Sequence, residues 1–258
     1  MNLLLLPGLL CDRAVWAPVL PRVGAVAACT VADYADETSL GAMAERVLVS
    51  APPTFAVAGH SMGGRVALEV LRRAPGRVER LALLDTGCRA RPAGAAGDDE
   101  RTARLALLAL AREQGMRAMA RAWVQPMVHP ARRTDAALID AVLAMFERRS
   151  PAQFAGQIDA LLARPDASGV LAQAACPVLV LAGREDGLSA PQQNMDMAAL
   201  ASGSRLVILE RCGHMAPMER PDETGAALAQ WLQAPAGGPP ATSNDANSNA
   251  YDPPGRVA

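Results

Sequence analysis

The chain has 258 residues, and its 25 basic and 26 acidic side chains give a formal net charge of −1 at pH 7. The sequence contains no lysine, which excludes a catalytic Schiff-base lysine and the phosphate-binding motif GxxxxGK[S/T]. The balanced charge argues against a general nucleic-acid or anionic-membrane binder, because such proteins need clustered positive charge.

Short apolar runs along the chain predict β-strands separated by helices. The runs are apolar throughout rather than alternating, which is typical of parallel strands covered by helices on both faces. The predicted strands span residues 2–6, 26–31, 54–58, 78–84, 177–182 and 205–210. This order predicts an α/β fold with about six mostly parallel strands, flanked by helices and joined by right-handed crossovers.

Helical spacing of apolar residues appears in the segments between these strands. Apolar residues recur at i, i+3, i+4, i+7 and i+8 over residues 40–48, and Thr38 or Ser39 can cap this helix. Further helices are expected around residues 66–71 and 228–232.

The alternation stops in residues 88–175, which carry helical patterns and no convincing strand. The expected helices are Asp98–Gln114, Met116–Met127, Thr134–Arg149 and Pro151–Arg164. Asp98 or Asp99 and Thr134 can serve as N-caps, and Gly115 separates the first two helices. An all-helical insertion between strands four and five predicts a lid over a site. A separate helical domain with its own partner is the alternative.

The expected organisation is a core formed by residues 1–87 and 176–233, a helical lid at 88–175 and a disordered tail at 234–258. The tail is rich in Pro, Gly, Asn and Ala and has too little apolar surface to fold alone. The first residues lack the basic start of a signal peptide, and no uncharged run approaches the roughly 20 residues that span a bilayer. We therefore expect a soluble cytoplasmic protein with reduced cysteines.

The strongest chemical signal is the sequence Gly59-His60-Ser61-Met62-Gly63-Gly64, which follows a predicted strand and opens a predicted helix. The motif G-x-S-x-G in this context forms a sharp, strained turn that exposes the serine hydroxyl at the carboxyl end of the strand. Ser61 is therefore the candidate nucleophile.

A serine hydroxyl becomes a good nucleophile only when a base takes its proton, and the chain has three histidines. His60 adjoins Ser61 and should point away from the hydroxyl. His129 lies in the predicted lid, where a rigid catalytic position is hard to supply. His214 lies just past the last strand, at the same sheet edge as Ser61, and is the predicted base.

The base needs a carboxylate partner, and the reaction needs two N–H groups for the developing oxyanion. Asp186 follows the fifth strand and is the predicted carboxylate, with Asp85 as its competitor; Glu185 should point elsewhere. The predicted oxyanion donors are the backbone N–H groups of Met62 and Leu9. Leu9 belongs to the loop after the first strand.

The segments LLLLPGLL, GHSMGG, LAGREDGL and CGHMAPMERP together resemble the α/β-hydrolase superfamily, in particular small bacterial esterases and lactonases with a helical lid. The resemblance covers residues 1 to about 233. It implies an α/β-hydrolase fold with Ser61, Asp186 and His214 as catalytic residues, and Leu9 and Met62 as the oxyanion hole. Two departures stand out. Pro7 replaces the usual histidine of the first loop, and six strands are expected rather than eight.

The expected activity is hydrolysis of a small carboxylic ester or lactone by water through an acyl-enzyme, with no metal or organic cofactor and no nucleic acid or membrane as partner. The candidate substrate-binding residues are Leu10, Trp123, Met127, His129, Leu188 and Met215. The same three residues could instead support C–C bond hydrolysis, perhydrolysis or cyanohydrin lyase chemistry. A non-catalytic ligand receptor on a hydrolase scaffold is the alternative from another class.

Overall fold

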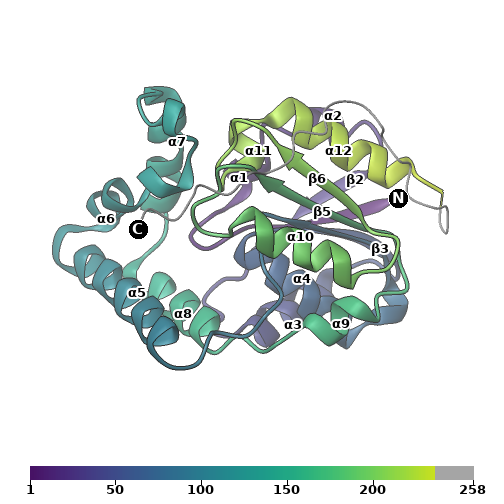
Figure 1. Ribbon diagram of the computed structural model, residues 1–258, viewed down its shortest axis with the longest axis horizontal. Coiled ribbons are helices and arrows are strands. Elements are labelled where there is room, and N and C mark those ends of the chain that lie inside the picture. Colours follow the sequence, from purple (N-terminus) through teal and green to yellow (C-terminus); the bar gives the residue numbers. More distant parts are fainter. Residues whose placement is uncertain (236–258) are drawn as a thin grey trace, which may run out of the picture.

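The computed structural model describes residues 1–235, which fold around a central β-sheet with helices on both faces (Figure 1). The strands are β1 (Asn2–Leu6), β2 (Ala28–Val31), β3 (Phe55–His60), β4 (Val78–Leu84), β5 (Val178–Gly183) and β6 (Arg205–Leu209). Their order is β2-β1-β3-β4-β5-β6, and every neighbouring pair is parallel. The predicted α/β class with six parallel strands is confirmed.

The burial of the strands follows from their position in the sheet. The inner strands β3 and β5 are buried along their whole length, whereas the edge strands β2 and β6 have partly exposed residues. Strand β2 begins two residues later than predicted, because the N–H groups of Val26 and Ala27 donate back to the carbonyl of Val23. This turn holds both residues out of the sheet.

Besides the four helices described next, residues 1–235 form eight α-helices. They are α1 (Arg13–Trp16), α2 (Leu20–Val23), α3 (Leu40–Ser50), α4 (Met62–Arg73), α9 (Ser168–Ala172), α10 (Pro191–Leu200), α11 (Ala216–Glu219) and α12 (Pro221–Gln233). Helices α2 and α12 cover one face of the sheet, and α3, α4 and α9 cover the other (Figure 1). Of the two predicted caps of α3, Ser39 is the one that accepts the N–H of Ala42.

Helices α5 (Ala95–Gln114), α6 (Met116–Trp123), α7 (Ala136–Glu147) and α8 (Pro151–Leu162) form the helical insertion. It lies between β4 and β5 in the chain, as predicted, and extends from one end of the sheet (Figure 1). Gly115 separates α5 from α6 with a φ of 87°.

The predicted helix starts in the insertion were wrong in two places. Helix α5 begins after Gly94, so Asp98 and Asp99 lie inside it rather than at its cap. Helix α7 is capped by Asp135, whose side chain accepts the N–H of Leu138, and not by Thr134. Thr and Asp are both good N-cap residues, so neighbouring candidates cannot be separated from the sequence alone.

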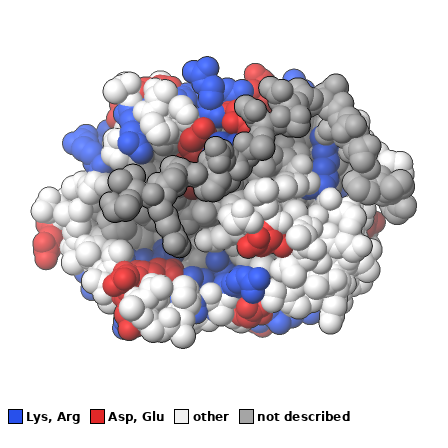
Figure 2. Space-filling view, in the orientation of Figure 1, with Lys and Arg blue, Asp and Glu red and all other residues white. Residues whose placement is uncertain are grey.

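Acidic and basic side chains are interspersed over the visible face of the molecule, in keeping with the balanced composition (Figure 2). Within residues 1–235, none of the helices combines the length and apolarity needed to cross a membrane. The five cysteines are free thiols. Residues 236–258 of the predicted tail lie outside the described residues.

Candidate active site

Ser61 occupies the turn between β3 and α4 in a conformation that non-glycine residues rarely adopt, with φ 54° and ψ −119°. Two glycines make this turn possible. A Cβ at Gly63 would lie 2.1 Å from the carbonyl oxygen of Leu6, and a Cβ at Gly59 would lie 2.2 Å from that of Gly63. The motif therefore fixes the strained turn by close backbone packing, as the sequence predicts.

The structure brings the predicted nucleophile, base and carboxylate into one hydrogen-bonded chain. The distance from Ser61 Oγ to His214 Nε2 is 2.8 Å, and that from His214 Nδ1 to Asp186 Oδ2 is also 2.8 Å. With the proton on Nδ1, the imidazole donates to the carboxylate and accepts the serine proton at Nε2. This is the arrangement that a serine hydrolase needs.

Asp186 is a fixed and ionised partner for His214. Its Oδ1 accepts the N–H groups of Leu188 and Ser189, both at 2.8 Å. Burial alone would raise the pKa of Asp186, but the charge and hydrogen bond of His214 and these two donors lower it below the ordinary value. The carboxylate consequently stays charged at neutral pH.

Asp85, the competitor for this role, serves a different one. It is completely buried at the end of β4, and its carboxylate accepts the N–H of Gly183 at 2.9 Å and that of Ala216 at 3.3 Å. Burial, reinforced by the negative charge of Asp186, raises the pKa of Asp85 well above its ordinary value. Asp85 therefore ties the end of β5 to the segment that follows His214.

The other two histidines are not in the hydrogen-bonded chain. His60 is buried, and its Nε2 donates to the backbone carbonyl of His214 at 2.7 Å. Burial, followed by the nearby His214, lowers the pKa of His60 to about 3, so it is neutral at pH 7. His129 is held through its backbone N–H, which donates to Glu219 Oε2 at 2.7 Å.

The loop after β1 is held rigidly although Pro7 stands where histidine is usual. The hydroxyl of Tyr34 donates to the Pro7 carbonyl at 3.0 Å, and the N–H of Leu10 donates to Gln157 Oε1 at 2.8 Å. Sequence reasoning missed both partners, since they lie 27 and 147 residues away and belong to no recognisable motif.

The predicted oxyanion donors face the cavity. Leu9 and Met62 both line it, and no hydrogen bond between residues 1–235 uses either backbone N–H. Met62 opens α4, where the partial positive charge of a helix N-terminus favours a developing anion. Both N–H groups are thus free to donate to a substrate oxygen.

Glu219 holds the loop that carries His214 and was not singled out from the sequence. Its Oε1 accepts the N–H of Gly213 at 2.9 Å and that of Met215 at 3.3 Å. On the other side, the N–H of His214 donates to the carbonyl of Met127 at 2.7 Å. The loop is therefore fixed from both the core and the helical insertion.

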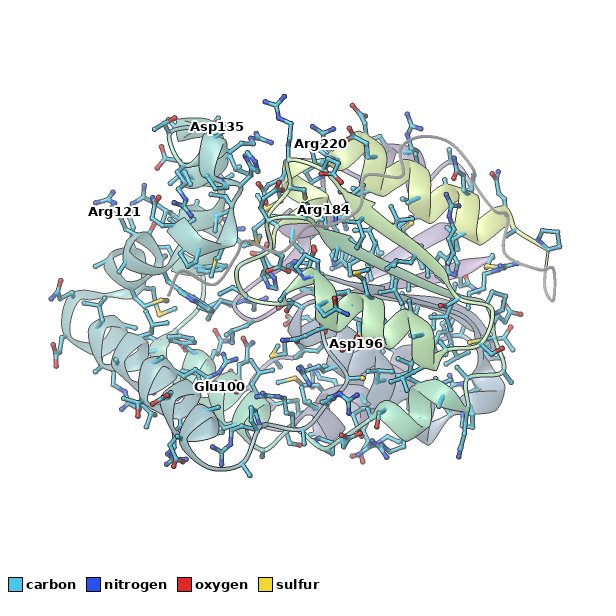
Figure 3. All side chains as sticks on the ribbon, in the orientation of Figure 1. Glu100, Arg121, Asp135, Arg184, Asp196 and Arg220 are labelled. Atoms are coloured by element: carbon cyan, nitrogen blue, oxygen red, sulfur yellow. The ribbon has the colours of Figure 1, made fainter. Side chains whose placement is uncertain are left out.

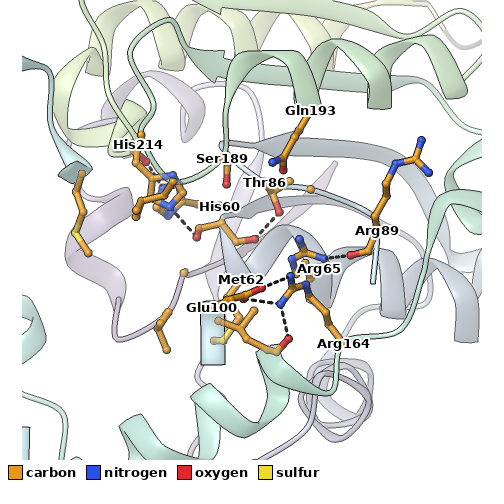
Figure 4. Close-up of a pocket in the computed structure, with 18 of the residues that line it drawn as sticks. His60, Met62, Arg65, Thr86, Arg89, Glu100, Arg164, Ser189, Gln193 and His214 are labelled. Carbon is orange, nitrogen blue, oxygen red and sulfur yellow. Dashed lines mark hydrogen bonds and ion pairs between the residues drawn. The ribbon is translucent and has the colours of Figure 1, made fainter. Parts of the chain in front are cut away.

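A cavity of about 720 Å³ opens beside Ser61 and His214, between the sheet and the helical insertion (Figure 4). Of the predicted substrate-binding residues, Trp123, Met127, Leu188 and Met215 line it. Leu10 does not, because its φ of 61° turns the fully buried side chain into the core. His129 does not either, since its ring folds back so that Nδ1 accepts the N–H of Ala131.

A family model described as alpha/beta hydrolase family matches residues 3–227. The chain is 26% identical over 245 residues to a pimeloyl-[acyl-carrier protein] methyl ester esterase of Aliivibrio salmonicida, covering 90% of this chain and 92% of that protein.

Solved structures of esterases and lactonases share the fold. A thermophilic esterase from Thermogutta terrifontis, solved with malate bound, superposes with a TM-score of 0.78 at 25% identity, covering 90% of this chain and 89% of that one. The enol-lactonase from Burkholderia xenovorans LB400 superposes with a TM-score of 0.78 at 22% identity, covering 90% and 91%. The resemblance expected from the sequence is confirmed.

Proposed function

Because the chain belongs to the alpha/beta hydrolase family, we propose that it hydrolyses a small carboxylic ester or lactone through an acyl-enzyme on Ser61. The observation that carries the proposal is the continuous chain of 2.8 Å hydrogen bonds from Ser61 through His214 to Asp186. The names of the relatives, an esterase and an enol-lactonase, support the carboxylic ester hydrolase class.

In the first step, Ser61 Oγ attacks the carbonyl carbon while His214 Nε2 takes the hydroxyl proton. The negative charge passes to the former carbonyl oxygen, which accepts hydrogen bonds from the N–H groups of Leu9 and Met62. Collapse of this intermediate breaks the ester C–O bond, and His214 gives its proton to the leaving alcohol. Asp186 stabilises the imidazolium that exists between these two transfers.

In the second step, a water molecule attacks the acyl carbon and His214 takes one of its protons. Collapse releases the carboxylic acid and returns the proton to Ser61. The net reaction adds one water across the C–O bond, which yields an acid and an alcohol, or a hydroxy acid from a lactone.

The helical insertion acts as the lid of this site. Trp123 and Met127 from the insertion and Met215 beside His214 form an apolar surface close to the reacting serine. Such a surface fits a short or medium acyl chain and excludes bulk water from the acyl-enzyme.

The test is hydrolysis of p-nitrophenyl esters and of small lactones by the wild-type protein and by Ser61→Ala. Removing a triad serine costs on the order of 10⁶-fold in kcat, so the variant should be inactive on both substrates. Ser50→Ala is the matched control, because Ser50 is exposed at the end of α3 and does not line the cavity. Wild-type activity in Ser61→Ala, or equal loss in Ser50→Ala, would contradict the proposal.

A further inference from the structure

The cavity has a second, charged end that the chemistry above does not use. Four arginines and two carboxylates line the cavity, so its wall carries a net positive charge although the whole chain carries −1. The arginines are Arg65, Arg89, Arg104 and Arg164, and the carboxylates are Glu100 and Asp196. Glu100 belongs to α5 and Asp196 to α10 (Figure 3).

Glu100 neutralises the charges of two of these arginines, Arg104 and Arg164, only in part. Arg164 binds it through two N–H···O contacts of 2.7 Å, and Arg104 Nε donates to it at 2.9 Å. Burial tends to raise the pKa of Glu100, but the hydrogen bond from Arg164 and the charge of Arg104 lower it below its ordinary value. One ionised carboxylate is therefore shared by two guanidinium groups.

Arg65 has no carboxylate partner among residues 1–235. Its Nη1 donates to the backbone carbonyl of Arg89 at 2.8 Å, and no hydrogen bond with these residues uses Nε or Nη2. Burial and the neighbouring Arg164 lower the pKa of Arg65 to about 10, which leaves the guanidinium charged at pH 7. Arg65 is half-buried, and Glu100, the carboxylate that attracts its charge, is hydrogen-bonded to Arg104 and Arg164 instead. A partly desolvated guanidinium of this kind is stabilised when a ligand carboxylate binds to it.

The position of Arg65 places it within reach of a molecule bound at Ser61. Arg65 lies in the first turn of α4, directly after the turn that holds Ser61, and both residues line the same cavity. Figure 4 shows Arg65 between Thr86 and the Glu100–Arg164 pair, on the wall of the same cavity as His214.

We propose that Arg65 binds a carboxylate of the substrate, so that the preferred substrate is a half-ester of a dicarboxylic acid or a lactone that bears a carboxylate. This inference rests on the proposed function, whose substrate class it narrows. The free Nε–H and Nη2–H groups form one edge of the planar guanidinium, and this edge matches the two oxygens of a carboxylate.

The alternative is that Arg65 has only a structural role. Its hydrogen bond to the carbonyl of Arg89 would then fix the segment after β4, and its loss would lower the activity on charged and neutral substrates alike. The ratio between a charged and a neutral substrate separates the two roles.

The kinetic test compares kcat/KM for monomethyl and dimethyl esters of the dicarboxylic acids from glutaric to suberic. In the wild type, the monomethyl ester of the best length should be preferred by at least about tenfold, as expected for a charged hydrogen bond. Arg65→Gln should abolish this preference, and Arg65→Lys should retain part of it. Arg101→Gln should keep the full preference, because Arg101 is exposed on the same helix as Arg104 and does not line the cavity.

A binding test separates the failure of this inference from the failure of the proposed function. The free dicarboxylates are titrated into the wild type and the three variants by calorimetry, which requires no turnover. Weaker binding by at least about tenfold in Arg65→Gln but not in Arg101→Gln supports the carboxylate site even if no ester is hydrolysed. Ester hydrolysis with an unchanged monomethyl preference in Arg65→Gln, or with no preference in the wild type, overturns the inference and leaves the proposed function intact.

Discussion

The carboxyl ends of the sheet strands and the helical insertion contribute to the site in different ways. Ser61, Asp186 and His214 follow the strands β3, β5 and β6, so the geometry of the parallel sheet brings them together at one edge. The insertion reaches the same site through a few side chains that contact residues far away in sequence, such as Gln157 with Leu10. Under the proposed function, the sheet positions the reacting groups, and residues of both the insertion and the core, such as Trp123 and Arg65, line the cavity beside them.

The two regions are nevertheless joined by hydrogen bonds at the loops that carry Leu10 and His214. Gln157 of α8 accepts the N–H of Leu10 in the loop after β1, and the carbonyl of Met127 accepts the N–H of His214. Outside the cavity, Arg148 of the insertion binds Asp12 with contacts of 2.7 and 3.0 Å. The insertion thus supports the loops that carry Leu10 and His214.

The largest difference between the regions should appear when one histidine from each is removed. We expect His214→Ala to lower kcat on a p-nitrophenyl ester by on the order of 10⁶-fold, because the proton of Ser61 then has no acceptor. His129→Ala, in the insertion, should change kcat by less than about threefold, since its ring lies outside the cavity. Comparable losses in the two variants would remove the distinction between the regions.

The buried carboxylate of Asp186 allows a sharper test of how the sheet orients His214. Asp186→Asn should lower kcat by about 10⁴-fold, because an amide favours the wrong tautomer of His214. Steady-state kinetics on the same ester gives the value, and circular dichroism checks the fold. An Asp186→Asn enzyme within tenfold of the wild type would show that His214 takes its orientation from another group.

Glu219 tests the bracing of the His214 loop. Glutamine supplies only one acceptor oxygen where the carboxylate accepts three backbone N–H groups, so Glu219→Gln should lower kcat by about 10- to 100-fold. KM should change less than kcat, because the residue positions the base and does not line the cavity. Glu223→Gln, at an exposed ion pair with Arg220, is the control and should be kinetically silent.

Gln157 tests the bracing of the oxyanion loop from the insertion. Gln157→Leu leaves the N–H of Leu10 buried without an acceptor, which costs about 1–3 kcal/mol, and kcat should fall by about tenfold as the loop relaxes. Gln157→Glu restores an acceptor and should recover most of the activity. Equal activity in the leucine variant would show that the insertion does not support this loop.

The last expected effect concerns stability rather than activity and is a pH dependence that arises at Asp85. Its pKa is raised in the folded protein by burial, so above the unfolded value of 3.8 the folded state holds a proton that the unfolded state has lost. The contribution of Asp85 to the unfolding free energy should therefore fall as the pH rises, by up to about 1.4 kcal/mol per pH unit within this window. Urea unfolding of the wild type and Asp85→Asn between pH 4 and 7 measures the difference between the two proteins, which should not depend on pH if Asp85 has an ordinary pKa in the folded state.

The sheet and the strained turn at Ser61 were predictable because they depend on local sequence. Apolar runs predict the strands, and the clash that a Cβ at Gly63 would make explains why the motif around Ser61 is so specific. The proximity of His214 to Ser61 followed from parallel strand ends meeting at one edge. Each of these inferences needs only neighbouring residues and the geometry of a parallel sheet.

The support of the site was not predictable because it depends on single long-range contacts. Glu219, Tyr34 and Gln157 each act through one or a few hydrogen bonds whose partners no periodicity reveals. Leu10 was expected to line the cavity, but its side chain is fully buried in the core and its φ is positive. Arg65 lies four residues after Ser61 in sequence, yet only the structure shows that its guanidinium binds no carboxylate among the described residues.

The most direct test of the central claim is mass-spectrometric mapping of the adduct formed with a fluorophosphonate, which reacts with activated serines. The account predicts a single covalent adduct on Ser61 in the wild type, formed far more slowly in His214→Ala and absent in Ser61→Ala. An adduct on another serine, or none on Ser61 in folded wild-type protein, would contradict it.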